Sequence, residues 1–286
     1  MQYLLILVCA FLSCTKVTTQ GFVAKENVKS PADAVILNCL VFACTAIVFS
    51  LSVKNGIDVH VVPYAILFGV FSSAFQIFYA LALEAGPFSA TCMLVNLNMV
   101  VPVIFSCIFF NEKLTAVKLL GMVMCFLALF LNTQNGGKKM NLKWIIYVFL
   151  AFFSTGAGIS ITQKLFAKSQ YSANVSQYVF LGYLVSFLTT GAIVLFNRSR
   201  GNKGSFKVNR KNILFVVIIA VSLGLFQRFN TYANSFIDAI VLNPSVCGLV
   251  TMLQMLSGRI IFKEKFTKRK ISSICVGIAA ILIISL

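Results

Sequence analysis

Phe75-Gln76-Ile77-Phe78 begins the stretch that decides the fold. An apolar run follows it, then Asn111-Glu112-Lys113-Leu114-Thr115, then a second apolar run that ends near Asn132. The same order returns between residues 226 and 286, as Phe226-Gln227-Arg228-Phe229, an apolar run, Lys263-Glu264-Lys265-Phe266-Thr267 and a last apolar run. The offset is 151 residues at the Phe-Gln pair and 152 at the Glu-Lys pair. The chain is therefore interpreted as two copies of one unit.

A weaker match extends the repeat toward the N-terminus. Thr19-Gln20 through Ala24-Lys25 resembles Thr162-Gln163 through Ala167-Lys168, at an offset of 143 residues. We therefore predict one repeat over residues 1–137 and a second over residues 138–286. Because the first apolar run carries part of this match and has no basic start or small-residue cleavage site, we expect it to be retained as a first span rather than removed as a leader.

The composition indicates a membrane protein. Of the 286 residues, 59% are hydrophobic and 11% are charged, and the mean hydropathy is +0.93. Soluble domains carry about 25% charged residues. The net charge of +17 lies between long apolar runs and is better explained by loops beside a membrane than by nucleic-acid binding. We expect the lipid bilayer as a partner and no nucleic acid.

The sequence offers no pattern for a metal, a cofactor or catalysis. The nine cysteines lie in apolar runs without a Cys-x-x-Cys motif, and His60 is the only histidine. Neither a ligand cluster at metal spacing nor a nucleophile–base pair follows from these residues. We therefore predict that the protein is not an enzyme and needs no cofactor.

Ten stretches are long and apolar enough to cross a bilayer, which takes about 20 residues per helix. The fold class predicted is an all-α polytopic membrane protein with ten transmembrane helices. The predicted spans are 2–24, 31–53, 62–83, 88–110, 115–133, 143–166, 174–196, 213–235, 239–262 and 270–286.

Five spans per repeat place the second copy upside down relative to the first. Two inverted five-helix repeats are the layout of many secondary transporters, in which the substrate site lies near the bilayer midplane between the repeats. We therefore expect a secondary active transporter that works by alternating access of the two repeats.

Lys and Arg residues predict the orientation. The odd-numbered loops, which follow spans one, three, five, seven and nine, carry 16 of them. The even-numbered loops carry 5, namely Lys54, Lys113, Lys118, Lys164 and Lys168. This difference predicts that the odd-numbered loops face the cytoplasm and that both termini face outward, with the plasma (inner) membrane of a bacterium as the expected location.

Short motifs through spans three to five resemble a known family. They are Tyr79-Ala80-Leu81, Ala90, Pro102, Glu112-Lys113-Leu114-Thr115 and Gly121, with Phe22-Val23-Ala24 and Lys25 at the end of span one and Glu264-Lys265-Phe266-Thr267 and Gly277 in the second half. Together they resemble the EamA-type members of the drug/metabolite transporter superfamily. The resemblance implies carrier-mediated movement of a small-molecule metabolite, and it leaves the substrate and a homodimer open.

The chain departs from this family at two points. Thr18-Thr19 stands where the family often has Trp-Gly, so contacts made there are not transferred to this chain. Relatives are usually described with cytoplasmic termini, whereas the charge count predicts the opposite.

Two cations lie deep inside predicted spans, where an ionisable group is costly and usually functional. We expect Arg228, assisted by Lys16, to bind a carboxylate or phosphate of an anionic or zwitterionic substrate, because the guanidinium matches such groups with two hydrogen bonds. The alternative is that both side chains reach toward an interface.

Uncharged polar residues complete the expected substrate site. Gln20 and Gln163 occupy equivalent positions in the two copies, as do Gln76 and Gln227, and equivalent positions converge on the centre of an inverted repeat. Hydrogen bonding between helices is the alternative for each residue. The predicted substrate-binding residues are Lys16, Gln20, Gln76, Tyr79, Asn96, Asn98, Gln163, Gln227, Arg228 and Asn230.

Other assignments remain open. Glu112 and Glu264 could carry protons, but each stands just ahead of a helix start, where a carboxylate stabilises the positive end of the dipole, and the structural role is favoured. A cation or drug exporter like the small multidrug-resistance proteins is the main rival function, although the first span has Lys16 in place of that family's glutamate. A membrane enzyme or lipid-handling protein is the remaining alternative.

Overall fold

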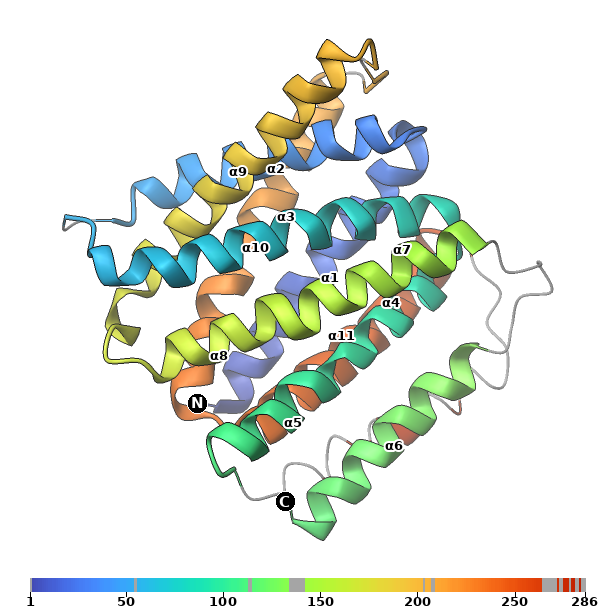
Figure 1. Ribbon diagram of the computed structural model, residues 1–286. Helices are drawn as coiled ribbons and strands as arrows, with labels where there is room; N and C mark the ends of the chain where they lie inside the picture. The colour runs from blue at the N-terminus through green and yellow to red at the C-terminus, as the bar shows by residue number, and fades with distance from the viewer. Residues whose placement is uncertain are drawn as a thin grey trace.

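The computed structural model describes residues 2–53, 56–112, 115–133, 142–202, 204–206 and 209–263, together with residues 272, 275–277, 279, 280 and 283. This part of the chain is helical and contains no strand. In order, its elements are α1 Gln2–Asn27, α2 Pro31–Ser50, η1 Val59–Val61, α3 Val62–Ala85, α4 Phe88–Asn96, η2 Leu97–Met99, α5 Val100–Phe109, α6 Ala116–Thr133, α7 Leu142–Phe153, the π-helix η3 Ser154–Ser160, α8 Ile161–Lys168, η4 Ser172–Asn174, α9 Val175–Ser199, α10 Arg210–Phe236 and α11 Ala239–Ile260 (Figure 1).

The first nine predicted spans each coincide with a helical segment of the structure. Eight of these segments are long and apolar enough to cross a membrane. Two spans that the sequence predicts as continuous are interrupted, the fourth by the 3₁₀ turn η2 and the sixth by the π-helix η3. The tenth, 270–286, lies largely outside the described residues, as does Glu264.

Capping residues set several helix ends. Ser30 adopts an extended conformation and its hydroxyl accepts from the backbone N–H of Asp33, with Pro31 at the first helical position of α2. Thr115 immediately precedes α6, and its Oγ1 accepts from the backbone N–H of Lys118 at 3.3 Å. Thr267, the equivalent residue in the second copy, is outside the described residues.

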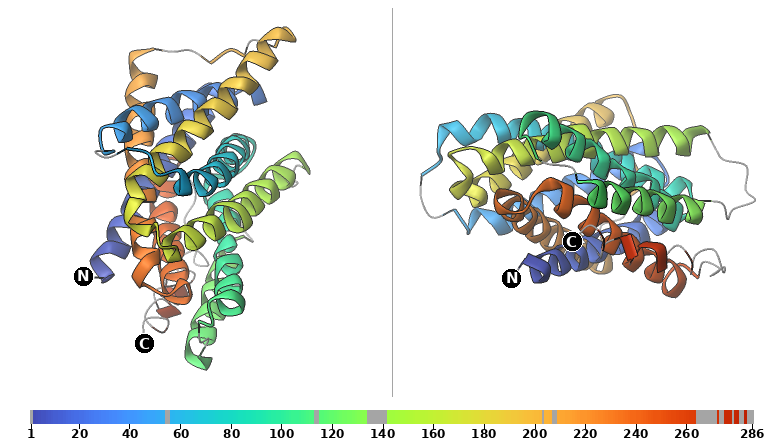
Figure 2. Two further views of the ribbon diagram at one scale, coloured as in Figure 1. Left: turned by 60° about the vertical axis from the view of Figure 1, so that its left-hand side comes forward. Right: turned by 90° about the horizontal axis from the view of Figure 1, so that it is seen from below.

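Helices from the two halves of the chain pack against each other throughout the bundle. α2 and α3 both contact α9, and α1 contacts α10 and α11. The approach of α3 to α9 depends on small residues, since a Cβ on Gly69 would lie 2.5 Å from the carbonyl oxygen of Gly182. α6 lies at one side of the bundle, as both views of Figure 2 show.

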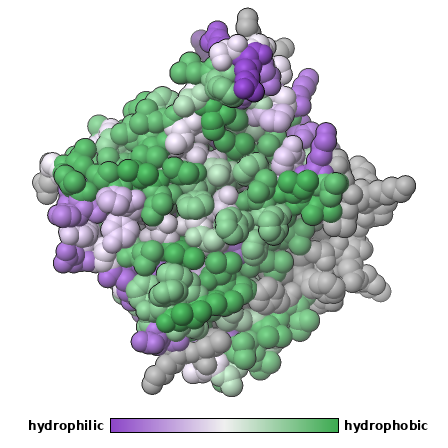
Figure 3. All heavy atoms as spheres, in the orientation of Figure 1, coloured by the Kyte–Doolittle hydropathy of each residue, from purple (hydrophilic) through white to green (hydrophobic). Residues whose placement is uncertain are grey.

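The loops form two faces at opposite ends of the helices. On the even-loop face, the Asn174 amide donates to the carboxylate of Asp58 at 3.2 Å, and Glu112 reaches α8 and α11. On the odd-loop face, Asp33 accepts from the backbone of Ser205, and Lys25 lies against Phe262. Hydrophobic residues cover most of the visible surface between these faces, and hydrophilic residues gather at opposite edges (Figure 3). This distribution matches a bilayer around the middle of the helices.

Candidate functional site

An internal cavity of about 120 Å³ lies at mid-length of the helices, between the two halves of the chain. Its walls come from α1, α3 and the α4–η2 junction on one side and from η3, α8, α9, α10 and α11 on the other. Its polar lining residues are Ser13, Lys16, Ser72, Gln76, Tyr79, Asn96, Asn98, Thr155, Ser160, Gln163, Gln227, Asn230, Asn243 and Gln254. A cavity this polar among apolar helices is suited to a small polar solute.

Lys16 supplies the positive charge of this cavity. The residue is 4% exposed, and within the described chain no carboxylate pairs with it. Its Nζ lies 5.0 Å from the ring centroid of Phe75 and 5.4 Å from that of Tyr79. These two rings stack on each other, with centroids 5.2 Å apart. Aromatic faces stabilise a cation by a small amount but do not neutralise it.

Polar side chains of α8 and α10 form a closed network at the other side of the cavity. Gln163 Nε2 donates to Thr231 Oγ1 at 2.8 Å, and Asn230 Nδ2 donates to Gln163 Oε1 at 3.2 Å. Gln227 Nε2 also donates to Thr231 Oγ1, at 3.5 Å. These bonds join α8 to α10 beside the cavity.

A second network joins α4 to α11. Asn96 Nδ2 donates to Thr251 Oγ1 at 2.8 Å and to Gln254 Oε1 at 3.1 Å. Asn98 Nδ2 donates to the carbonyl oxygen of Val95 at 2.6 Å, at the turn where α4 gives way to η2. The two Asn96 bonds connect the two halves of the chain beside the cavity.

The two interrupted spans meet at the cavity. In the π-helix, Thr155, Ile159 and Ser160 line the space, and a Cβ on Gly156 would lie 3.3 Å from Cβ of Asn98 in η2. Discontinuous helices at mid-membrane are a recurring feature of transporter binding sites. Pro244 lies inside α11 one residue after Asn243, another lining residue.

Buried polar atoms without a partner gather on α1 and α3. Gln20 is 1% exposed, and neither its Nε2 nor its Oε1 has a hydrogen-bond partner. Gln76 lines the cavity, and its Oε1 is likewise without a partner. Because an unsatisfied buried polar atom is costly, the Gln76 amide indicates the part of the cavity wall that a solute would complete.

Eight of the ten predicted site residues line the cavity, namely Lys16, Gln76, Tyr79, Asn96, Asn98, Gln163, Gln227 and Asn230. Gln20 is buried one turn beyond Lys16 on α1 and is not among the lining residues.

Arg228 does not line the cavity, which corrects the expectation that it leads substrate binding. Its side chain is exposed on the outside of α10. Gln227, Asn230, Thr231 and Asn234 are buried and share the inner face of the helix, and Arg228 is turned about 100° away from Gln227. The interpretation that its long side chain reaches toward an interface fits this position better.

Several lining residues were absent from the predicted site. Thr155 and Ser160 belong to Ser154-Thr155-Gly156-Ala157-Gly158-Ile159-Ser160, a run of small and polar residues inside an otherwise apolar span. That run is the sequence signal that could have identified them, because it lowers the helix propensity of a transmembrane segment at one place.

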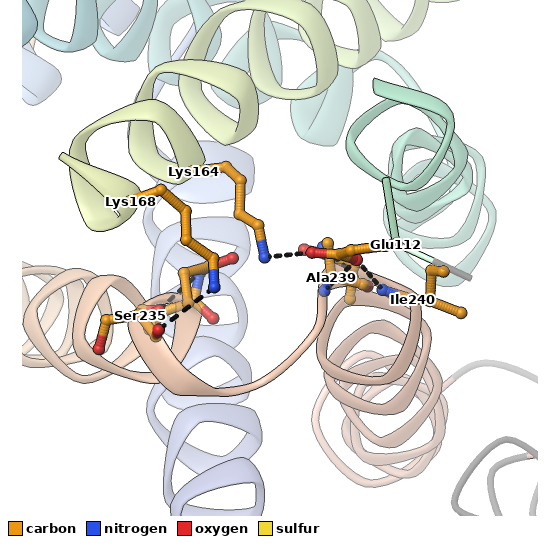
Figure 4. A network of polar contacts seen from close by, with 9 residues as sticks. Glu112, Lys164, Lys168, Ser235, Ala239 and Ile240 are labelled. Atoms are coloured by element: carbon orange, nitrogen blue, oxygen red, sulfur yellow. Dashed lines mark hydrogen bonds and ion pairs between the residues drawn. The ribbon is translucent and has the colours of Figure 1, made fainter. Parts of the chain in front are cut away.

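Glu112 and Lys164 form a buried ion pair on the even-loop side of the cavity. Their Oε1 and Nζ atoms lie 2.7 Å apart, and the two side chains are 7% and 1% exposed. Glu112 Oε2 accepts from the backbone N–H groups of Ala239 at 2.9 Å and Ile240 at 3.4 Å (Figure 4). The carboxylate thus meets the N-terminus of α11 rather than that of the helix that follows it in sequence, and Lys164 is an interior residue of α8 rather than a loop residue.

Comparisons with known proteins agree with this architecture. Residues 3–134 match the EamA-like transporter family, which confirms the resemblance inferred from the motifs. That family consists of membrane transporters and not of enzymes, in agreement with the expectation of a non-enzymatic function. No curated protein matches the sequence.

The fold also resembles a crystal structure that is described only as that of a protein. The TM-score is 0.69, over 97% of this chain and 98% of the other. The two sequences are 15% identical, so the likeness concerns the fold alone.

Proposed function

We propose that this EamA-like transporter is a secondary active carrier of a small anionic or zwitterionic metabolite, worked by alternating access of two inverted repeats, residues 1–137 and 138–286. The substrate binds in the cavity between the repeats. Lys16 holds its anionic group, and the Gln76 amide of α3 binds another of its polar atoms.

Helix boundaries support the division into two related halves. α3 ends at Ala85 and α10 at Phe236, while α4 begins at Phe88 and α11 at Ala239, so both boundaries recur at the 151-residue offset of the motifs. The backbone repeats as well, since Asn111 and Lys263 have φ angles of 51° and 52°. An offset of 152 residues relates these two positions.

The observation that carries the proposal is Lys16, a buried cation that faces the cavity without a carboxylate partner in the described chain. A charge in this position is costly unless a ligand, water or a counter-ion compensates it. A carboxylate or phosphate would do so through a charge-assisted hydrogen bond.

The two sides of the cavity differ in what they leave unsatisfied. Gln163 binds both Asn230 and Thr231 and joins α8 to α10, whereas Gln76 of α3 keeps an unpartnered Oε1 at the cavity. The polar end of the substrate therefore lies against α1 and α3. The cavity is close in size to an engineered one of about 150 Å³ that holds benzene, so a compact solute fits this conformation.

Export of cationic drugs is the alternative function within transport. A cation carrier needs an acidic group at the site, and none of the described residues that line the cavity is Asp or Glu. Lys16 would repel a cationic substrate from the same space.

We predict that Lys16→Met weakens anion binding strongly while the protein still folds. The change keeps the apolar stem and removes the charge. Purified protein would be screened by thermal shift against carboxylates, amino acids, sugar phosphates and quaternary amines, where a ligand at 100 times its Kd stabilises by about 2.7 kcal/mol. Loss of a charge-assisted hydrogen bond should weaken the best anion by about 10- to 100-fold.

Arg228→Met is the matched control, because it removes a cation from the outer surface of the neighbouring α10. Anion binding should be unchanged in this variant, and uptake of the same anion into proteoliposomes should follow the binding results. Stabilisation by quaternary amines alone, or equal loss in both variants, would contradict the proposal.

A further inference from the structure

Glu112 connects the two halves of the chain at a single buried point. It follows α5 in the first half, and its two carboxylate oxygens contact Lys164 of α8 and the first amides of α11, both in the second half. In Figure 4 the carboxylate lies between the Lys164 side chain and the end of α11. Lys168 adds a nearby contact from α8 to α10, with Nζ 3.4 Å from the carbonyl oxygen of Ser235.

This ion pair lies directly beyond the cavity on the even-loop side. Asn243 lines the cavity, and Ala239, which donates to Glu112, precedes it by four residues or about 6 Å along α11. Gln163 lines the cavity next to Lys164 in sequence. The Glu112 contacts therefore lie between the cavity wall and the even-loop face along α8 and α11.

The contact is strong only while all its members are present. A carboxylate at a helix N-terminus gains from the dipole, and a buried ion pair with further hydrogen bonds holds firmly. Removing one partner leaves the other charge buried and uncompensated, which favours its exposure to water.

An aromatic contact lies on the odd-loop side of the bundle. The rings of Phe88, at the start of α4, and Phe262, just after α11, are stacked with centroids 4.3 Å apart. A Cβ on Gly21 of α1 would lie 2.7 Å from the Phe88 ring and 3.2 Å from that of Phe262, so α1 presses directly on this pair. Lys25 covers Phe262, with Nζ 4.8 Å from the ring centroid.

These two contacts occupy equivalent places in the two repeats. Gly21 corresponds to Lys164 at the 143-residue offset, and Phe88 corresponds to Ala239 at 151. Phe262 corresponds to Phe110, two residues before Glu112, at 152. Each set joins the first helix of one repeat, the start of the fourth helix of that repeat and the loop after the fourth helix of the other.

We propose that these sets are the two gates of the carrier and that they differ in chemistry. The Glu112–Lys164 pair on the N-terminus of α11 closes the even-loop side, and the Phe88–Phe262 stack against Gly21 closes the odd-loop side. This inference rests on the proposed alternating access. The inference names the residues that close each side. It also explains why a change of charge opens one gate and a loss of aromatic volume opens the other.

The even-loop gate lies closer to the cavity than the odd-loop gate does. Phe88 stands seven residues, or about 10 Å, from the lining residue Val95, against about 6 Å between Ala239 and Asn243. Weakening the ion pair therefore opens the shorter of the two routes to the cavity.

Cys247 lines the cavity and provides a native reporter for both gates. The full-length protein in right-side-out and inside-out membrane vesicles would be treated with a membrane-impermeant methanethiosulfonate reagent, and modification of Cys247 followed by mass spectrometry. Glu112→Gln should raise its rate about tenfold or more from the even-loop side only, because Lys164 is left unpaired. Phe262→Ala should raise the rate from the odd-loop side only.

Matched controls separate gating from general loosening. Glu26→Gln breaks the exposed Glu26–Lys211 pair, whose atoms are 3.3 Å apart, and Phe109→Ala removes one ring of the stacked Phe105–Phe109 pair on the outer surface. Neither should change the rate at Cys247. Unchanged rates in both gate variants, or a rise from the wrong side or from both sides, would overturn the assignment.

Thiol modification needs no substrate, so its result is independent of the anion assigned to Lys16. A side-specific opening without any anion binding would support the assignment of the gates and refute the proposed substrate class. Anion binding without side-specific opening would support the proposed substrate class and refute the assignment of the gates.

Discussion

Asn111 and Lys263 hold the same left-handed backbone conformation just after α5 and α11. Left-handed φ costs an ordinary residue about 1–2 kcal/mol, whereas asparagine tolerates it better and glycine is unstrained. Asn111 is therefore suited to this turn in the first half, whereas Lys263 is strained at the same turn in the second half.

At Lys263 we predict that Lys263→Gly stabilises the protein by about 1 kcal/mol, because relief of strain exceeds the entropy that glycine adds to the unfolded chain. Asn111→Gly, at the equivalent turn, should change the stability by less than about 0.5 kcal/mol. The free energy of unfolding would be measured by unfolding the purified protein with increasing concentrations of a denaturing detergent. An equal gain at both positions, or a loss at Lys263, would contradict this account.

Depth in the membrane was predictable for single residues, but direction around the helix was predicted less well. Lys16 was correctly expected in the interior because an unpaired cation in the middle of an apolar span requires a polar environment. Arg228 has a similar depth, yet it points outward. The stripe of Gln227, Asn230, Thr231 and Asn234, at spacings of three and four residues, already marked the inner face of α10 and excluded Arg228 from it.

At the scale of elements, the apolar runs located the helices well because length and hydropathy suffice for that purpose. The interruptions at η2 and η3 were not predicted. Their positions depend on close contact between two spans that are far apart in sequence, such as the approach of Gly156 to Asn98. The Glu112–Lys164 pair escaped prediction for the same reason, since only the folded bundle brings α5, α8 and α11 together.

Gly158 of the π-helix η3 packs against Phe71 of α3. We predict that Gly158→Ala reduces both stability and substrate uptake, because the new Cβ would lie 2.2 Å from Cγ of Phe71 and would push the two segments apart. Overpacking of this kind costs about 1–3 kcal/mol. The thermal midpoint and uptake into proteoliposomes would both be measured.

Gly191→Ala in α9 is the control, since no atom lies within 4 Å of its added Cβ. It should be neutral or slightly stabilising, by at most about 1 kcal/mol, because alanine is the better helix former. A Gly158→Ala protein with normal stability and uptake would show that η3 does not depend on this contact.

At the scale of the whole molecule, the orientation in the membrane remains a prediction from charge. Moving Lys164 from the loops to the interior of α8 strengthens the asymmetry on which it rests, since the even-numbered loops lose one of their five positive residues.

We predict that His60 is outside the cell and Arg200 inside, because the first lies on the even-loop face and the second on the basic odd-loop face. Both are exposed, so His60→Cys and Arg200→Cys would be labelled in intact cells with a membrane-impermeant maleimide. Labelling is expected at position 60 and not at position 200 until the cells are opened. The reverse pattern would place both termini in the cytoplasm, as in described relatives of the family.

The unequal chemistry at Gly21 and Lys164 has a consequence for the kinetics of the cycle. A carrier built from two identical halves would spend equal time open to either side, since its two open forms would have the same free energy. In the proposed cycle, the Glu112–Lys164 ion pair breaks to open one side and the Phe88–Phe262 contact breaks to open the other. The resting carrier therefore favours one side of the membrane, which sets the concentration at which each side saturates it, while the gradients alone still set the final distribution of the solute.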